Sequence, residues 1–574
     1  MKKFLCGLLA LLLVLGAFSG FTACNGKDNS SSSSPTDISD YFLRVEGTNV
    51  VDGEGNIVYL RGGNSGGLGV IEQWMNGFTQ SSSEESSIVC IDHLTTSKVF
   101  IERFGMDGAK ELWAEYQENW FNETDFANCA AMGMNVIRFP FTYMNVDFDA
   151  VSGLEYAGKN YDFTLLDYFV ETAANYGLYT ILDLHGAYGS QNGKDHSGEV
   201  QSAGSVDFYS NQQKQDLTAN LWKAIAEHFK DNPYVAGYDI LNEPAETTGS
   251  GTMTTELRHW IVFDKIYDAI RSVDQNHIVI FESCWDGKNL PQPSTYGWEN
   301  CMYSFHHYTG TSDYDGNTVS WNAKLDEVIS QDFGVPLYMG EFTCYNNADS
   351  WNYCLDLMAA QGWHWTSWTY KVNATSVMPW GIYNIQVSRD DKINAHLDSY
   401  DTIIEKMQGL RTTEYAKPYA FSDGQTLYSI FHENLHNPVE ILDLSAGRYW
   451  IRTPEYNALT TSNTILQNYT VVTEGNGKWD GFDVYLSNDA NEEFSVYLKM
   501  QNYYFSIVDN GSRAFLTLSK QETASARFFL VKAEDGYKIL SYATRKYLRY
   551  DENNKLFYAD ANKENAKIFF IETA

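Results

Sequence analysis

Two glutamates, each at the end of a short apolar run, are the residues of this sequence best suited to acid–base chemistry. Glu243 ends the segment Asp239-Ile240-Leu241-Asn242-Glu243, and Glu341 ends Tyr338-Met339-Gly340-Glu341. Hydrolysis of a glycosidic bond needs one carboxyl group to protonate the leaving oxygen and a second, ionised one to attack the sugar or activate water. A single glutamate at a strand end is more often an ion-paired or capping residue. The pair, rather than either residue alone, therefore points to this chemistry.

Other polar and aromatic side chains stand at the ends of comparable runs. They are Arg138, His185, Asn242, His306, Tyr308 and Trp368. In a barrel of parallel strands, the groups that do chemistry project from the carboxyl ends of the strands. We therefore expect these side chains to form one polar cluster with the two glutamates, an arrangement that a purely structural barrel does not need.

The elements that must position this cluster are eight short runs rich in β-branched and aromatic residues. They cover residues 58–64, 135–141, 179–185, 235–243, 277–283, 302–308, 336–342 and 364–370. Between them lie amphipathic stretches with apolar residues at three- and four-residue spacing, such as 165–176, 212–229 and 255–273. This alternation predicts the α/β fold class and a (β/α)₈ TIM barrel over residues 40–436, with an inserted loop at 79–87.

The segment 437–574 has a different pattern, because helical periodicity stops and short aromatic strands recur. Residues 526–530 are echoed by residues 566–570, 40 positions later. A repeat of this length indicates stacked equivalent units. The segment resembles a fascin-like β-trefoil, with a two-sheet sandwich as the alternative. Its expected role is carbohydrate binding; the alternative is a domain that only packs beside the barrel.

The N-terminus has the pattern of a targeting segment. Lys2 and Lys3 precede an apolar run over residues 4–18, and a serine-rich stretch follows Cys24. The run is too short to span a bilayer comfortably and resembles a bacterial lipoprotein signal. We expect a signal peptide at 1–23, lipid on Cys24, a linker at 24–39 and an exported protein held at a membrane. Cleavage nearby with free secretion is the alternative.

The amino-acid composition limits the classes of binding partner and cofactor that we expect. The formal net charge of −34 opposes binding to an anionic polymer, so nucleic acid is not expected. An aromatic content of 15% suits stacking against sugar rings. The eight cysteines show no CxxC pair and no zinc spacing, so we expect no metal and no organic cofactor. A disulfide between Cys344 and Cys354 is conceivable, but none is assigned.

Several segments together resemble retaining glycoside hydrolases of family 5, the cellulase-like group of the 4/7 clan. These are Asn135-Val136-Ile137-Arg138, Ile240-Leu241-Asn242-Glu243-Pro244, His306-His307-Tyr308 and Met339-Gly340-Glu341-Phe342. Residues 60–67, 72–74 and especially 183–193 are similar to the exo-β-1,3-glucanase branch. The resemblance extends over roughly residues 45 to 375 and implies double displacement with retention, with β-1,3-glucan as the expected substrate.

The resemblance also implies a role for each candidate residue. Glu243 would be the acid/base and Glu341 the nucleophile, held ionised by hydrogen bonds from Arg138 and Tyr308. Asn242 would contact the sugar 2-hydroxyl.

Four further residues complete this implied site. His185 and His306 would bond substrate hydroxyls or orient Glu243, Trp368 would form the floor under the reacting sugar, and Glu72 would contact its far hydroxyls.

Departures from the family pattern leave the linkage open. The exo-glucanase branch usually has proline at the positions of Gln73 and Tyr188 and asparagine at that of His196. The alternatives are β-1,4- or β-1,6-glucan, mannan or a β-glucoside as substrate, and transglycosylation in place of hydrolysis. A different class, a surface glycan-binding lipoprotein without catalysis, is also considered. A monomer is expected.

Overall fold

The computed structural model describes residues 42–202, 205–245, 255–283 and 286–436, and the strands between 447 and 573 with gaps at several loops. The predicted signal peptide, Cys24, the linker at 24–39 and Cys284 lie outside the described residues. Within the described ranges, no helix combines the length and the apolar character that a membrane crossing requires.

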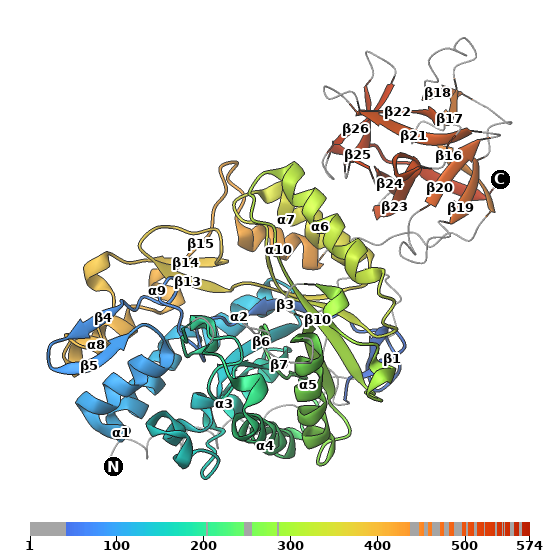
Figure 1. Cartoon of the computed structure of the whole chain (residues 1–574). Helices are drawn as coiled ribbons and strands as arrows, with labels where there is room; N and C mark the ends of the chain where they lie inside the picture. The colour runs from blue at the N-terminus through green and yellow to red at the C-terminus, as the bar shows by residue number, and fades with distance from the viewer. Residues whose placement is uncertain are drawn as a thin grey trace, which may run out of the picture. The chain divides into compact units, whose positions relative to one another are not determined.

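The centre of the main domain is a closed barrel of eight parallel strands, joined in the order β10-β11-β12-β3-β6-β7-β8-β9 (Figure 1). The strands are β3 (Arg61–Asn64), β6 (Val136–Thr142), β7 (Tyr179–Gly186), β8 (Val235–Asp239), β9 (Ile278–Ser283), β10 (Cys301–Tyr308), β11 (Leu337–Thr343) and β12 (His364–Ser367). Each predicted run overlaps one of these strands, so the predicted TIM barrel is confirmed.

Helices cover the outside of the barrel, and their apolar faces form one core with the strands. They include α1 (His93–Trp120), α2 (Glu123–Ala131), α3 (Thr164–Asn175), α4 (Gln212–Phe229), α5 (Thr255–Arg271), α6 (Tyr314–Ile329), α7 (Ala348–Ala360), α8 (Tyr400–Gln408), α9 (Thr412–Tyr415) and α10 (Leu427–His436). The predicted helical stretches at 165–176, 212–229 and 255–273 correspond to α3, α4 and α5.

Strand β8 is shorter than predicted and ends at Asp239, four residues before Glu243. The cause is a tertiary contact: the carbonyl of Asn242 accepts a hydrogen bond from the side chain of Gln191 at 2.8 Å, and Glu243 has a positive φ of 39°. The backbone N–H groups of Ile240 and Asn242 still bond to the neighbouring strands, but the regular ladder ends at Asp239.

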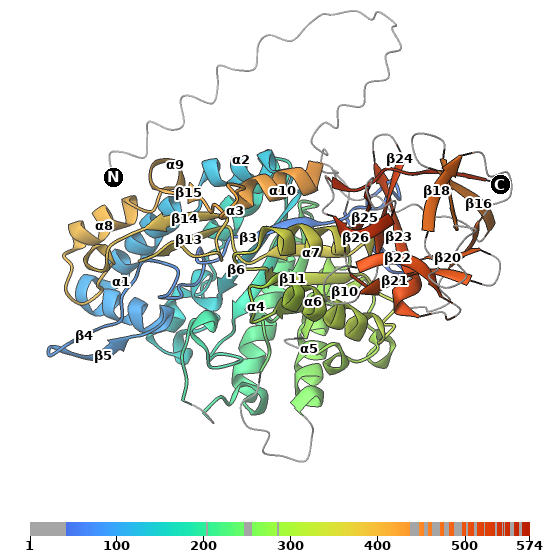
Figure 2. The ribbon, with the colours of Figure 1, turned by 90° about the horizontal axis from the view of Figure 1, so that it is seen from above.

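Smaller sheets surround the barrel. They are formed by β1 (Arg44–Glu46) with β2 (Asn49–Val51), and by β13 (Lys371–Ala374), β14 (Tyr383–Gln386) and β15 (Lys417–Pro418). The predicted insertion at 79–87 overlaps a hairpin of β4 (Ser81–Ser83) and β5 (Ser86–Cys90). Figures 1 and 2 both show this hairpin beside α1, outside the ring of barrel strands.

The C-terminal segment is all β, as predicted, and its strands form one 12-stranded antiparallel sheet with a separate apolar core. The strands are β16 (Gly447–Arg452), β17 (Asn457–Thr461), β18 (Val471–Gly475), β19 (Phe482–Leu486), β20 (Val496–Met500), β21 (Tyr503–Asp509), β22 (Ala514–Ser519), β23 (Arg527–Ala533), β24 (Gly536–Ser541), β25 (Tyr547–Asp551), β26 (Leu556–Ala561) and β27 (Phe570–Thr573). The trefoil arrangement itself stays a prediction.

The cysteines in the described residues are buried free thiols: Cys90, Cys129, Cys301, Cys344 and Cys354. Cys344 Sγ lies 3.0 Å from Cys354 Sγ and donates a hydrogen bond to it.

Candidate active site

A cavity of about 500 Å³ opens at the carboxyl ends of the barrel strands. It is lined by Glu72, Trp74, His185, His196, Asn242, Glu243, Tyr308, Glu341, Trp368, Met378 and Trp380. Seven of the nine predicted site residues are in this lining. The other two, Arg138 and His306, are fully buried and reach the same carboxylates from below. The structure therefore brings all nine together.

Glu341, on β11, receives a hydrogen bond on each carboxylate oxygen. Arg138 Nη1 donates to Oε1 at 2.9 Å, and the Tyr308 hydroxyl donates to Oε2 at 2.7 Å. Burial raises the pKa of Glu341, but the charges of His306 and Arg138 outweigh this effect, so the pKa lies below its usual value. The site holds Glu341 as a carboxylate, the form that a nucleophile needs.

Glu243 is held by both its backbone and its side chain. Its N–H donates to Glu282 at 2.7 Å, and its carbonyl accepts from Asn192 at 3.1 Å, which secures the positive φ. Oε1 lies 2.9 Å from His306 Nδ1, and Oε2 lies 3.2 Å from His196 Nε2. The carboxyl group thus sits between two imidazoles.

Burial raises the pKa of Glu243, but the hydrogen bond from His306 and a positive charge on His196 outweigh it and lower the pKa to about 2. For His196, burial lowers the pKa, but Glu243 and Glu72 raise it above its usual value. Glu243 and His196 must therefore be treated as a pair, because a proton lost by one is favoured on the other.

The two glutamates face each other across the cavity. A carboxylate oxygen of Glu243, a carboxylate oxygen of Glu341 and a nitrogen of His306 all lie within 4.8 Å of one another. Retaining glycosidases place their carboxyl groups about 5 to 5.5 Å apart, and inverting ones place them about 6.5 to 9.5 Å apart. An oxygen–oxygen separation of at most 4.8 Å agrees with the closer, retaining arrangement.

Arg138, on β6, organises the floor of the site. Its guanidinium contacts Asp239 at 2.9 Å, Asp183 at 3.1 Å and Glu282 at 3.4 Å, besides Glu341. Burial is the main cause that raises the pKa of Asp183 to about 8 and that of Asp239 to about 7, and it also raises the pKa of Glu282. Burial thus favours the neutral forms of these acids, which reduces their competition with Glu341 for the charge of Arg138.

His185 lies on the nucleophile side of the cavity. Its Nδ1 contacts Asp183 at 2.6 Å, its Nε2 lies 4.0 Å from Glu341, and its ring stacks on Trp368 at 5.4 Å with an interplanar angle of 5°. The sequence predicted that His185 and His306 would either bond substrate hydroxyls or orient Glu243. His306 is the one of the two that contacts Glu243.

Aromatic side chains form one wall of the cavity and meet Glu72. Trp74 Nε1 donates to Glu72 Oε2 at 2.8 Å, and the Trp74 ring packs against Trp380 at 5.5 Å. The other Glu72 oxygen is buried without a hydrogen-bond partner among the described residues, and burial raises the pKa of Glu72 to about 7.

Several supporting residues were not predicted. Gln191 and Asn192 hold the backbone of Asn242 and Glu243, while Trp74, Trp380 and Met378 complete the wall. Gln191 and Asn192 belong to segment 183–193, which carries the similarity to the exo-β-1,3-glucanase branch. Their contacts with the backbone after β8 depend on how this loop folds, so the sequence does not reveal them.

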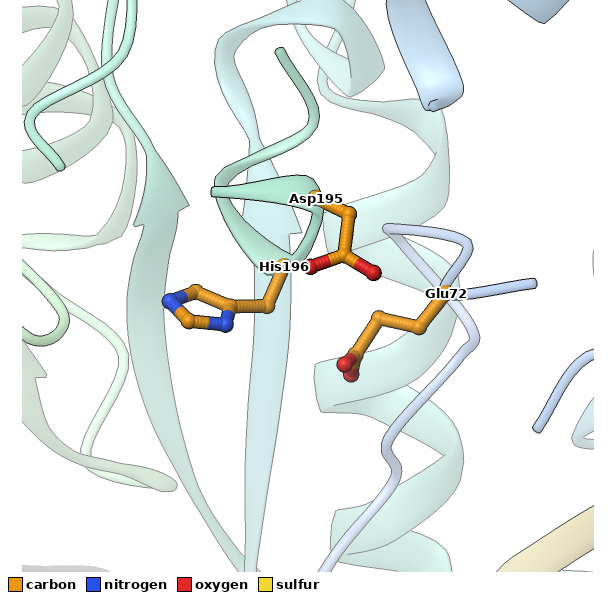
Figure 3. A group of neighbouring side chains, drawn as sticks. All are labelled: Glu72, Asp195 and His196. Atoms are coloured by element: carbon orange, nitrogen blue, oxygen red, sulfur yellow. The ribbon is translucent and has the colours of Figure 1, made fainter. Parts of the chain in front are cut away.

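Two groups of side chains have donor atoms close enough to share a cation: Glu243 with His306 and Glu341, and Glu72 with Asp195 and His196. Figure 3 shows the second group, with Glu72 and Asp195 on one side of the His196 ring. Both groups adjoin the cavity and contain polar atoms suited to a sugar. We therefore assign no metal ligand.

A parallel barrel that carries two facing glutamates at this spacing has the active-site architecture of a retaining glycoside hydrolase. Residues 101–374 match the family model described as cellulase (glycosyl hydrolase family 5). Over these residues, the barrel is similar to glycosyl hydrolase family 5.

Curated relatives agree with this assignment. The chain is 31% identical to a β-xylosidase of Phanerodontia chrysosporium over 47% of this chain and 52% of the relative. It is 30% identical to glucan 1,3-β-glucosidase 1 of Schizosaccharomyces pombe, over 43% and 58% respectively. The matched region thus spans about half the length of these relatives. Among solved structures, endogalactoceramidase aligns with a TM-score of 0.45 and 16% identity, covering 93% of this chain and 100% of that one, a similarity too low to bear on function.

Proposed function

We propose that this protein is a retaining β-glycosidase that cleaves β-glucan, with β-1,3-glucan as the substrate. The observation that carries the proposal is the pair of facing glutamates, one bonded by Arg138 and Tyr308 and the other set between two imidazoles. The similarity to glucan 1,3-β-glucosidases supports the choice of glucan.

In the first step, a Glu341 oxygen attacks the anomeric carbon and forms an ester with the sugar. The bond from that carbon to the leaving oxygen breaks, and the proton of Glu243 goes to this oxygen. The hydrogen bonds from Arg138 and Tyr308 orient the attacking carboxylate. Asn242, which is held by Arg138 Nη2 at 2.9 Å, is placed to contact the sugar 2-hydroxyl.

In the second step, Glu243 acts as a base. It removes a proton from water, the water oxygen attacks the anomeric carbon, and Glu341 leaves as a carboxylate. Two inversions at one carbon give overall retention. A sugar hydroxyl in place of water would give transglycosylation through the same intermediate.

A second candidate substrate is a β-xyloside, because the β-xylosidase relative is 31% identical. Xylose lacks the hydroxymethyl group of glucose, so a pocket that accepts only one of them must differ around that group. The two candidates share the mechanism and differ only in the sugar that the cavity accepts.

The test is product analysis on β-1,3-, β-1,4- and β-1,6-linked gluco-oligosaccharides, with aryl β-glucoside and aryl β-xyloside in parallel. We expect fastest turnover on the β-1,3 series and a β-anomer as the first product by proton NMR. Preference for the xyloside would select the second candidate. An α-anomer would contradict retention.

The isosteric variant E341Q should abolish turnover while sugar binding persists. The amide keeps the shape of the carboxylate but cannot attack the anomeric carbon. Loss of both would show that the substitution damages folding. Sugar binding by the wild type without turnover on any substrate would favour the non-catalytic class.

The proposal includes how the protein is placed in the cell. We propose that it is an exported monomer held at a membrane by lipid on Cys24, and that the C-terminal domain captures glycan. The sequence pattern around Cys24 and the aromatic strands of the C-terminal segment support this. Incorporation of a labelled fatty acid that is lost in C24A tests the anchor, light scattering tests the monomer, and affinity electrophoresis on immobilised glucan tests capture.

A further inference from the structure

Two of the buried thiols lie in contact with each other beside the strand that carries the nucleophile. Cys344 follows directly after β11, which holds Glu341, and Cys354 lies within α7. Both residues are fully buried, and their Sγ atoms are 3.0 Å apart. The pair therefore joins the carboxyl end of a catalytic strand to the helix that follows it.

The two sulfur atoms are close to the separation of a covalent bond. A disulfide has a sulfur–sulfur length of about 2.03 to 2.05 Å, so each Sγ would have to move by about 0.5 Å. Small rotations of the two side chains supply a movement of this size. The backbone of β11 and α7 can therefore stay in place when the bond forms.

Oxidation of this pair would leave no buried polar group without a partner. The Cys344 thiol donates to Cys354 Sγ, and the Cys354 thiol donates to the carbonyl of Trp351 at 3.3 Å. Both donors disappear together when the sulfur atoms bond. The Trp351 carbonyl lies inside α7, where the helix backbone also uses it as an acceptor. The bond thus replaces two weak thiol hydrogen bonds at no cost in unsatisfied groups.

The turn between the two cysteines supports the aromatic wall of the cavity. Trp351 Nε1 donates to the carbonyl of Tyr345 at 2.8 Å, and Asn347 caps α7 by accepting from the backbone N–H of Ser350 at 2.8 Å. The Tyr345 ring meets the ring of Trp380, a cavity residue, edge-on at 5.3 Å. A link between the cysteines would fix both ends of this turn.

We propose that Cys344 and Cys354 form an intramolecular disulfide in the exported protein, and that this bond ties the turn after the nucleophile strand to α7. The inference rests on the proposed export, because disulfides persist in oxidising compartments, and not on the proposed glucanase activity. The two thiols lose two protons and two electrons and form one sulfur–sulfur bond. The disulfide of a thiol–disulfide oxidoreductase accepts them and becomes two thiols.

The burial of the pair determines when the bond forms. Burial raises the pKa of Cys354 well above its usual value, so little of the thiolate that attacks a disulfide exists in the folded protein. Both sulfur-bearing residues are also closed to an oxidant from solvent. The bond therefore forms during folding, before α7 covers the two sulfur atoms.

The experiment maps the free thiols of the full chain after folding in an oxidising compartment and after folding in a reducing cytoplasm. Thiols are blocked with N-ethylmaleimide in denaturant, and the chain is then cut with trypsin without a reductant. Tryptic peptide 325–371 contains Cys344 and Cys354 and no other cysteine. We expect this peptide to be unlabelled and lighter by two hydrogen atoms in the oxidised sample, and to carry two labels in the reduced one.

Two results of the mapping would overturn the inference. One is a doubly labelled peptide 325–371 in both samples. The other is a bond from Cys344 or Cys354 to a different cysteine or to a second chain. The mapping needs no substrate, so an enzyme inactive on glucans would defeat the proposed function and leave this test intact.

Melting temperatures of the same two samples test the tie to α7. The oxidised wild type should melt at least about 3 °C above the reduced one, because the bond restricts the unfolded chain. Equal melting temperatures of the two wild-type samples would contradict the tie. The double variant C344A, C354A should give the same melting temperature from both compartments.

The matched control is C90A. The Cys90 thiol is also buried, but it donates to the carbonyl of Thr95 rather than to another sulfur. C90A should keep the difference between the two samples. Loss of the difference in C90A would show that Cys90 takes part in the bond, and this also overturns the pairing. If the double variant fails to fold, the thiol map of the wild type still decides.

Discussion

Tyr308 stabilises the ionised form of the nucleophile Glu341 through one hydrogen bond. Its hydroxyl donates to Glu341 Oε2 at 2.7 Å, and the other oxygen is bonded by Arg138. A hydrogen bond to a charged group contributes about 1.5 to 3 kcal/mol. Removing it should weaken the carboxylate form without removing the ion pair.

We therefore predict that Y308F lowers kcat about 10- to 100-fold. The pKa of Glu341 should rise, because the charged form loses a donor, so the acid limb of the pH–rate profile moves to higher pH. Measuring kcat from pH 4 to pH 8 checks this. An acid limb that stays in place would mean that Tyr308 acts on the substrate rather than on Glu341.

The supporting contacts of Glu243 show what residue types alone do not reveal. A glutamate after an apolar run can be identified in the sequence, but its positive φ of 39° cannot. A non-glycine residue adopts this conformation at a cost of about 1 to 2 kcal/mol. Here Glu282 and Asn192 hold the backbone on both sides, and they come from other parts of the barrel.

Strand β11 brings its backbone close to β10 beside the catalytic pair. A Cβ added at Gly340 would lie 2.6 Å from Ser304 Oγ and 3.0 Å from His306 Nε2. The first separation is too short, so Ser304 Oγ would have to move. The second is tight, so the His306 ring would shift by a few tenths of an ångström, and with it the contact to Glu243. The glycine before the nucleophile is thus needed for the position of the histidine on the neighbouring strand.

We predict that G340A reduces kcat/KM at least about 10-fold while the protein still folds, because a displaced His306 no longer bonds Glu243. The matched control is G63A on β3, where the added Cβ would meet its nearest atom at an ordinary 3.6 Å. Steady-state kinetics and melting curves of both variants check this. Equal activity in the two variants would show that β10 adjusts without consequence.

The helices and strands of the barrel could be predicted well from the sequence. The eight strand runs and the helices α3, α4 and α5 follow from apolar periodicity, which depends only on nearby residues. The early end of β8 was missed because it depends on Gln191, from the segment after the neighbouring strand, which takes the carbonyl that the sheet would otherwise use.

At the scale of the whole molecule, buried ionisable groups shape the response to pH. Burial raises the pKa values of Glu72, Asp183 and Asp239 to about 7, 8 and 7. Between their ordinary values and these values, the folded protein binds more protons than the unfolded chain, so stability falls as pH rises. Burial also lowers the pKa values of four histidines to about 3: His93, His259, His307 and His364. Below about pH 6.5 these four histidines outnumber the three acids, so stability falls on acidification.

We predict that the melting temperature is highest near about pH 6 and falls between about pH 6.5 and pH 8, where the lowered histidines no longer titrate and the buried acids still do. Each such acid contributes up to about 1.4 kcal/mol per pH unit in this window. Thermal scans from pH 4 to pH 9 check the profile. D183N removes one of these acids and should flatten the alkaline side, and a melting temperature constant up to pH 9 would contradict the explanation.

Apart from Glu72, which followed only from the family resemblance, the sequence by itself determined the fold class, the change to an all-β C-terminal segment and the eight site residues at strand ends. These depend on local periodicity and on residue types at strand ends, and parallel strands in a barrel bring those ends together. Only the tertiary structure decided the spacing of the two carboxyl groups, the placement of His196 against Glu243 and the aromatic wall. These depend on distances between side chains from separate loops, and such distances exist only after the chain has closed the barrel.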